Sequence, residues 1–145
     1  MMKRPTPLPA SAYLHFIDIT TRWNDNDPYG HINNVVYYEY FDTVTNAFLV
    51  DKGVLDINRG AVIGLMVETH CNYFRPIAFP EKVRAGMRVA RLGTSSVRYE
   101  VGIFRNDEDL ASAQGYVVHV YVDRVSGRPV PLPEVLKEAL MPLMR

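Results

Sequence analysis

The chain is poor in several features that would narrow its function at once. Its 145 residues include a single cysteine, Cys71, so no disulfide can form within the chain. Basic and acidic residues number 16 each, which gives a formal net charge of zero and no reason to expect nucleic acid or a membrane surface as partner. No segment approaches the roughly 18 apolar residues that cross a bilayer, and the N-terminal segment lacks the apolar stretch of a signal peptide. These absences favour a cytoplasmic protein.

The composition that is present fits one domain. Hydrophobic residues make up 48% and charged residues 22%, as in ordinary globular proteins, and no repeat or linker interrupts residues 1–145. Pro5, Pro7 and Pro9 break up the N-terminus. We therefore expect a single domain over residues 1–145 that begins with a loose arm at residues 1–11.

The stretch from Thr21 to Lys52 is the most informative part of the chain. Its first half is punctuated by Pro28 and Gly30, which predicts a loop. That loop is dense in groups that can do chemistry: Asn24, Asp25, Asn26, Asp27, His31, Asn33 and Asn34.

A helix follows this loop. Apolar residues recur at three- and four-residue intervals, which places them on one helix face. They are Val36, Tyr37, Tyr40, Phe41, Val44, Ala47 and Phe48. Asn33 or Asn34 can cap the start of the helix, and Gly53 is expected to end it. The helix would have roughly 18 residues and be about 27 Å long.

After Ala61 the hydrophobic period becomes two, which indicates strands. Another strand is expected before the loop and helix. The expected strands are Tyr13–Trp23, Val62–Phe74, Lys82–Leu92, Ser95–Phe104 and Leu110–Asp123. Within the third, Val83, Ala85, Met87, Val89 and Arg91 are expected to share one face. A short helix, Glu134 to Met144 (within residues 133–144), closes the chain.

The connections between these strands are short, which requires antiparallel neighbours. One long helix is available to cover the resulting sheet. The sequence therefore predicts an α+β fold in which a curved antiparallel sheet of about five strands wraps one central helix.

Several familiar site patterns are missing from the sequence. The Asp25-x-Asp27-x-x-Gly30 spacing imitates the start of an EF-hand loop, but Tyr29 and Val36 stand where that loop needs oxygen ligands. There is no zinc pattern of histidines or cysteines, no phosphate-binding loop and no nucleophile elbow. We therefore expect no metal site.

The run from Arg22 to Asn34, with Asp27-Pro28-x-Gly30-His31-x-Asn33-Asn34 at its centre, resembles the hotdog-fold thioesterases of the 4-hydroxybenzoyl-CoA thioesterase-like family. Tyr37, Tyr40, Phe41 and Asp42 carry the resemblance further. Weaker agreement in Val67-Glu68, in Asn72–Pro76 and in the valine-rich strand Ala113–Val122 extends it over roughly residues 13–125. The His-x-Asn-Asn form is similar to a branch of general acyl-CoA thioesterases, whereas the 4-hydroxybenzoyl enzymes have apolar residues at position 31.

The resemblance implies a hotdog fold in which two subunits pair their sheets side by side, with active sites at the subunit interface. It implies a homo-oligomer, either a dimer or a dimer of dimers. The substrate would be an acyl thioester of coenzyme A or of acyl carrier protein, and the only cofactor would be coenzyme A as part of that substrate. Asp27 would be the catalytic carboxylate.

Thioester hydrolysis needs an activated water or nucleophile and a stabiliser for the oxyanion. Asp27 can act as general base or as attacking carboxylate. Backbone N–H groups from Gly30 to Asn34 can polarise the carbonyl, and the family resemblance selects the N–H of Asn34. Gly30 would allow close approach of the ligand, and His31 would hold Asp27 or a water. The alternative roles are a turn residue for Asp27 and helix caps for Asn33 and Asn34.

Further residues are candidates for substrate binding. Tyr37 belongs to the helix core and, secondarily, to an acyl pocket, while Glu68 is either near the reactive end or a structural carboxylate. Arg88, Arg91 and Arg98 stand where family members contact the phosphates of coenzyme A, although a solvated sheet edge explains them as well. His70 and His119 lie within strands and are expected to be packed or exposed.

Two functions from different classes follow. The first is an acyl-CoA thioesterase that uses Asp27 and helix N-terminal amides. The second is a non-catalytic module that binds acyl thioesters on the same fold. A hotdog-fold dehydratase is a third possibility, but the histidine–carboxylate motif of those enzymes is not found here.

Overall fold

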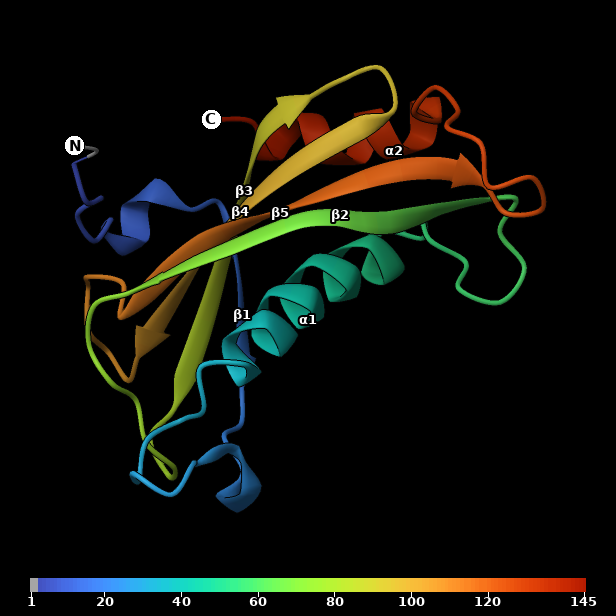
Figure 1. The fold of residues 1–145 in the computed structure, drawn as a ribbon. Coiled ribbons are helices and arrows are strands. Elements are labelled where there is room, and N and C mark those ends of the chain that lie inside the picture. Colours follow the sequence, from blue (N-terminus) through green and yellow to red (C-terminus); the bar gives the residue numbers. More distant parts are fainter. Residues whose placement is uncertain (1–2) are drawn as a thin grey trace.

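The computed structural model describes residues 3–145. The helix α1 (Val36–Asp51) lies against the concave face of one antiparallel sheet, which curves around it (Figure 1). The strands are β1 (His15–Ile19), β2 (Val62–Tyr73), β3 (Val83–Leu92), β4 (Ser96–Arg105) and β5 (Ala113–Asp123). Their order across the sheet is β1-β3-β4-β5-β2. This arrangement confirms the predicted α+β hotdog fold.

The core lies between α1 and the concave face. Alternate residues of β3 and β4 point towards the helix and are fully buried, as the two-residue period predicts. In α1, Phe41 and Val44 are fully buried against them. Arg91 is an exception, because β3 has a register shift between Val89 and Arg91 and Arg91 therefore pairs with Arg98 on the convex face. Its predicted place beside Val89 was wrong.

Two strands are shorter than expected. β1 ends at Ile19, and residues Trp23–Asp25 form the 3₁₀ helix η2. The buried Asp25 carboxylate accepts hydrogen bonds from the Arg22 backbone N–H (2.8 Å) and the Arg22 Nε–H (2.9 Å), and these bonds turn the chain. At the other strand, β5 begins at Ala113 rather than Leu110.

The segment before β5 pairs instead with the N-terminal arm. The Ala111 N–H donates to the Leu8 carbonyl (3.0 Å), and the Ala10 N–H donates to the Asp109 carbonyl (2.8 Å). Leu8 and Ala10 pack on the small cluster around Phe104, on the convex side of the sheet. Backbone pairing therefore holds residues 8–10 of the arm that proline content predicted to be loose. Residues 1–2 of that predicted arm lie outside the described residues.

Both ends of α1 are defined by local chemistry. Neither expected asparagine occupies the N-cap position, which falls on Val35; Asn33 instead accepts a bond from the Val35 N–H through its side chain (3.1 Å). At the other end Gly53 adopts a positive φ of 69°, and the Val54 N–H reaches back to the Leu49 carbonyl (3.1 Å). This is a Schellman ending, so the expected stop at Gly53 is confirmed.

The chain closes with α2 (Glu134–Leu140) and the 3₁₀ turn η3 (Met141–Leu143), close to the expected C-terminal helix. Leu136, Leu140 and Leu143 join the main core. The segment lies near the β3–β4 hairpin, where the Arg145 N–H bonds to the Val89 carbonyl (3.1 Å). Within residues 3–145, none of the helices combines the length and apolar character that crossing a bilayer takes.

Candidate functional site

Asp27 lies in a tight loop that leads into α1. Its N–H donates to the His31 carbonyl (2.8 Å), and its carbonyl accepts from the Gly30 N–H (3.0 Å). Gly30 has a φ of 85°, which a residue with a side chain rarely adopts. The carboxylate oxygen Oδ1 accepts from the Tyr29 N–H (2.8 Å). Backbone groups therefore fix the direction of the half-buried Asp27 side chain.

The connection between β2 and β3 lies beside this loop at the N-terminal end of α1 (Figure 1). The Ile32 N–H donates to the Ile77 carbonyl (2.7 Å), and the Phe79 N–H donates to Asn26 Oδ1 (3.0 Å). Two segments far apart in sequence are thus bonded to each other. Together they form the walls of the candidate site.

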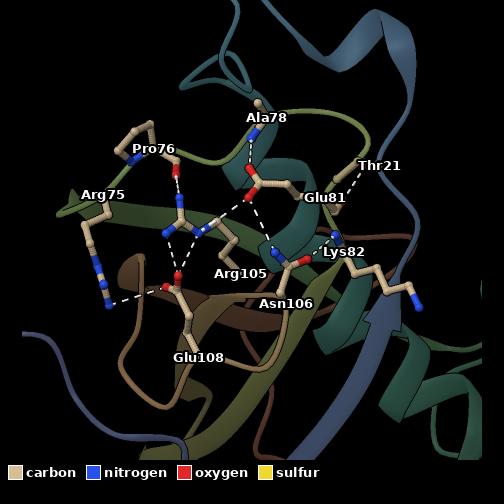
Figure 2. A network of polar contacts seen from close by, with 9 residues as sticks. All are labelled: Thr21, Arg75, Pro76, Ala78, Glu81, Lys82, Arg105, Asn106 and Glu108. Atoms are coloured by element: carbon tan, nitrogen blue, oxygen red, sulfur yellow. Dashed lines mark hydrogen bonds and ion pairs between the residues drawn. The ribbon is translucent and has the colours of Figure 1, made fainter.

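A network of polar side chains holds the β2–β3 connection in place (Figure 2). Arg105 Nε donates to Glu108 Oε1 (2.8 Å), and Arg105 Nη1 donates to the Pro76 carbonyl (3.3 Å). Glu81 Oε1 accepts from the Ala78 N–H (2.8 Å), which closes the loop on itself. The network connects the site walls to the end of β4.

A cavity of about 320 Å³ opens between the two segments. Four residues that the sequence singled out line it: Asp27, His31, Asn34 and Tyr37. The remaining lining residues are Ile32, Tyr73, Phe74, Arg75 and Pro76. Gly30 shapes the turn beside it.

Four of these lining residues, Tyr73 to Pro76, were missed as site residues from the sequence. Their only signal was the weak family agreement at Asn72–Pro76. The Tyr73 hydroxyl donates to the Asn34 carbonyl (2.7 Å) and so fixes the start of α1. Arg75 brings a cation to the cavity, where its Nη2 lies 3.5 Å from Glu108 Oε2.

The cavity combines a carboxylate with a donor that protein atoms leave unused. Asn34 is an exposed residue, and among the hydrogen bonds of residues 3–145 none has its backbone N–H as donor. Such N–H groups at a helix start favour negative charge. Burial raises the pKa of Tyr37 to about 12, so its hydroxyl stays neutral at pH 7. The arrangement can hold a carbonyl oxygen near N–H groups while a carboxylate acts on the carbon.

Glu68 lies away from this cavity, on the convex face. A register shift in β2 places Met66 opposite His119 and Glu68 opposite Val118, so Val67 is an extra residue. Because His119 points towards α1 and Val118 points away, Glu68 points away as well.

The three predicted arginines also belong to the convex face. Arg88 donates through Nε to Glu100 Oε1 (2.8 Å), and Arg98 lies over the Tyr116 ring at 3.7 Å from its centroid. Arg88 and Arg98 line a separate cavity of about 290 Å³. Arg91 is exposed and pairs across the strands with Arg98. The structure therefore does not bring the arginines to Asp27.

The two strand histidines differ in environment. His70 is exposed, with Nε2 3.1 Å from Asn72 Oδ1. His119 is buried between Tyr99 and Tyr121, and burial lowers its pKa to about 4. Across residues 3–145, no three histidine, cysteine, aspartate or glutamate side chains cluster as metal ligands would.

The chain is similar to known proteins in sequence and in structure. The PA5185 protein of Pseudomonas aeruginosa is 51% identical in sequence, with a TM-score of 0.93 over 95% of this chain and 96% of that one. A thioesterase of Thermus thermophilus, solved with coenzyme A and zinc, is 30% identical, with a TM-score of 0.74 over 88% of this chain and 92% of that one. The YsmA protein of Bacillus subtilis is 25% identical over 131 residues, 90% of this chain and 88% of its own length.

The family model described as the thioesterase-like superfamily matches residues 21–140. This match begins just before the Asp27 loop and includes α1, β2 to β5 and α2. It therefore includes both segments that form the cavity. The chain belongs to the thioesterase-like superfamily.

Proposed function

We propose that this protein hydrolyses the thioester bond of an acyl-CoA or acyl carrier protein substrate, with Asp27 as general base or nucleophile. The observation that carries the proposal is that Asp27 and Asn34 line the same cavity and that the Asn34 N–H donates to no residue in the range 3–145. Membership of the thioesterase-like superfamily supports the same reaction class.

The chemistry needs only groups that line this cavity. As a base, Asp27 takes a proton from water, and the resulting hydroxide attacks the thioester carbon. The carbonyl electrons move to oxygen, where the Asn34 N–H and the helix N-terminus stabilise the negative charge. The C–S bond then breaks, and the thiolate leaves and takes up a proton. As a nucleophile, Asp27 would form an anhydride that water hydrolyses afterwards.

Coenzyme A is the first choice of thiol because a relative that is 30% identical was solved with it. Arg88, Arg91 and Arg98 stay the proposed phosphate contacts from the family resemblance. Arg75 joins them, since its guanidinium lines the cavity that contains Asp27. The proposed location of the protein is the cytoplasm.

Homodimerisation, or a dimer of dimers, is part of the proposal. The strand β2 forms an edge of the sheet, and three consecutive apolar residues in the middle of this strand are exposed. These are Leu65 (46% exposed), Met66 (41%) and Val67 (58%). An open edge with apolar side chains is a template for strand pairing, which fits the side-by-side pairing that the family resemblance implies.

The test is thiol release, followed with a thiol-trapping dye, from short, medium, long and aromatic acyl-CoAs. The wild type, Asp27→Asn and a control carboxylate variant, Asp51→Asn at the far end of α1, are compared. We expect rapid release by the wild type and the control, and a drop of about 10²–10⁴-fold in Asp27→Asn. Near-normal turnover in Asp27→Asn would overturn the role of Asp27. Thioester binding without any release would favour the non-catalytic module.

A further inference from the structure

Arg75 lines the Asp27 cavity from the connection between β2 and β3. Its backbone N–H donates to the Ser112 carbonyl (3.1 Å), and the preceding Phe74 N–H donates to the same carbonyl (2.8 Å). These two bonds hold the connection against the residue just before β5. They therefore set the point from which the Arg75 side chain leaves the backbone, while the side chain itself is 44% exposed.

The guanidinium of Arg75 keeps its donors free. Among the hydrogen bonds of residues 3–145, none has an Arg75 side-chain N–H as donor. Its one ion pair in the same range joins Nη2 to Glu108 Oε2 at 3.5 Å. A guanidinium presents its N–H groups in a planar fork that matches carboxylate and phosphate groups. Arg75 therefore offers such a fork to a ligand.

Glu108 supplies the negative charge that faces Arg75, yet its hydrogen bonds go to Arg105 (Figure 2). Arg105 Nε donates to Glu108 Oε1 (2.8 Å), and Arg105 Nη2 donates to the same oxygen. The other oxygen, Oε2, is buried and forms no hydrogen bond within residues 3–145. Glu108 therefore attracts the Arg75 guanidinium electrostatically without using its hydrogen bonds.

Arg105 is held at more than one point, which gives Glu108 a defined position. Arg105 Nη1 donates to the Pro76 carbonyl (3.3 Å), and Arg105 Nε lies 3.6 Å from Glu81 Oε2. Figure 2 shows Arg105 between the two carboxylates, with Arg75 beyond Glu108. Two glutamates and two arginines thus alternate in a chain of charges that ends at the Asp27 cavity.

This cavity contains two opposite charges that do not pair with each other. Arg75 is the only arginine or lysine among its lining residues, and within residues 3–145 no ion pair joins it to Asp27. An anionic group of a ligand is attracted by Arg75 and repelled by Asp27. Such a group therefore lies on the Arg75 side, which leaves the thioester carbon to the Asp27 side.

Resting on the proposed function, we infer that Arg75 binds an anionic oxygen group of the substrate and that Glu108 positions the Arg75 guanidinium for it. The group is a carboxylate on the acyl chain or a phosphate on the thiol, since a guanidinium fork binds both. Arg75 is thus a specificity-determining residue, and Glu108, which lies outside the cavity lining, is a positioning residue.

The test measures thiol release from three thioesters with one medium chain length. The first is an acyl-CoA with a terminal carboxylate, the second is its methyl ester, and the third is the same methyl ester linked to pantetheine, which has no phosphate. We expect Arg75→Gln to raise KM about tenfold for the substrates that contain the bound group, with kcat nearly unchanged. Arg128→Gln replaces an exposed arginine beyond β5 and should leave all three KM values unchanged.

The pattern of KM values identifies the source of the anion. A rise for both coenzyme A thioesters, but not for the pantetheine thioester, assigns the phosphate. A rise confined to the substrate with the terminal carboxylate assigns the acyl chain. Equal KM values in the wild type and Arg75→Gln, or an equal rise for all three substrates, would overturn the inference.

A double-mutant cycle tests the role of Glu108. Glu108→Gln removes the charge that faces Arg75 but keeps an oxygen for Arg105, so it should raise the same KM values by less than Arg75→Gln does. In the Arg75→Gln background it should have no further effect, because Glu108 acts through Arg75. Effects that add in the double variant would show that Glu108 only stabilises the cavity wall.

Binding without turnover separates this inference from the proposed function. Calorimetry compares free coenzyme A with pantetheine, and a medium-chain dicarboxylic acid with its monomethyl ester, on the wild type and Arg75→Gln. Weaker binding to Arg75→Gln of only the more anionic member of either pair supports the site, even if no thioester is hydrolysed. Unchanged binding in both pairs contradicts the site, while thiol release that depends on Asp27 leaves the proposed function standing.

Discussion

Asp27 owes its orientation to backbone donors rather than to a charged partner. The Tyr29 N–H bonds to its Oδ1, and no residue in the range 3–145 forms an ion pair with it. An asparagine side chain has the same oxygen and can accept the same bond. The charge of Asp27 can therefore be removed without disturbing the loop.

Two substitutions of Asp27 can separate the effect of its charge from that of its hydrogen bond on stability. Asp27→Asn should change the free energy of unfolding by less than about 0.5 kcal/mol, whereas Asp27→Ala should lower it by about 1 kcal/mol because it also removes the turn bond. Urea denaturation of both variants checks this. Equal losses would show that the charge, rather than the bond to Tyr29, stabilises the loop.

His119 gives the protein a pH dependence of its own. Its pKa is about 4 in the folded state against 6.5 for an ordinary histidine, so between these values the unfolded chain binds more protons. Stability should therefore be lost as pH falls from about 6.5 towards 4. Between pH 7 and pH 4.5 the free energy of unfolding should fall by about 2 kcal/mol more for the wild type than for His119→Phe.

Denaturation of the two proteins at both pH values measures this linkage. His70→Phe is the matched control, since it removes a histidine from the convex face and should follow the wild type. Parallel loss of stability in the wild type and His119→Phe would show that other groups cause the acid sensitivity.

At the scale of elements, α1 could be read from the sequence, because its apolar residues repeat with the helical period and Gly53 stops it. The strands could be read because their apolar residues repeat with a period of two. The register shifts at Val67 and Ala90 could not be predicted from the sequence. One inserted residue does not change the composition of a strand, yet it turns every later side chain to the other face. The shift at Ala90 is the reason why Arg91 was placed on the wrong face, and the shift at Val67 turns Glu68 to the convex face.

The site was predictable where its residues are neighbours in sequence. Asp27, His31 and Asn34 belong to one loop, and the motif identified them together. Tyr73 and Arg75 reach the cavity only because the Ile32 N–H bonds to the Ile77 carbonyl, a long-range contact that no local pattern reveals.

The end of α1 provides a test at this scale. A Cβ at Gly53 would meet nothing within 4 Å, so Gly53→Ala changes only the backbone preference at φ 69°. Left-handed backbone costs a residue with a side chain about 1 kcal/mol, and the free energy of unfolding should fall by that amount. Glu138→Ala, an exposed helix substitution, should stay within about 0.5 kcal/mol. A neutral Gly53→Ala would mean that the helix end rearranges.

At the scale of the whole molecule, the proposed dimer depends on the edge strand β2. Val67→Lys places a charge on the exposed edge and should shift the protein from dimer to monomer in sedimentation experiments. Val125→Lys is the matched control, because Val125 is 94% exposed in the turn after β5. A dimer that withstands Val67→Lys would place the subunit contact elsewhere.

The Asp27 cavity and a second cavity of about 250 Å³, whose lining includes Leu55, Ile57 and Ile63, have no lining residue in common. The proposed bond breaking belongs to a hydrogen-bonded pair of loops, whereas the second cavity is formed mainly by apolar side chains at the other end of α1. A library restricted to Leu55, Ile57 and Ile63 would alter the second cavity and leave the Asp27 loop unchanged. One end of the molecule can therefore vary in sequence while the loop that carries the proposed chemistry stays the same.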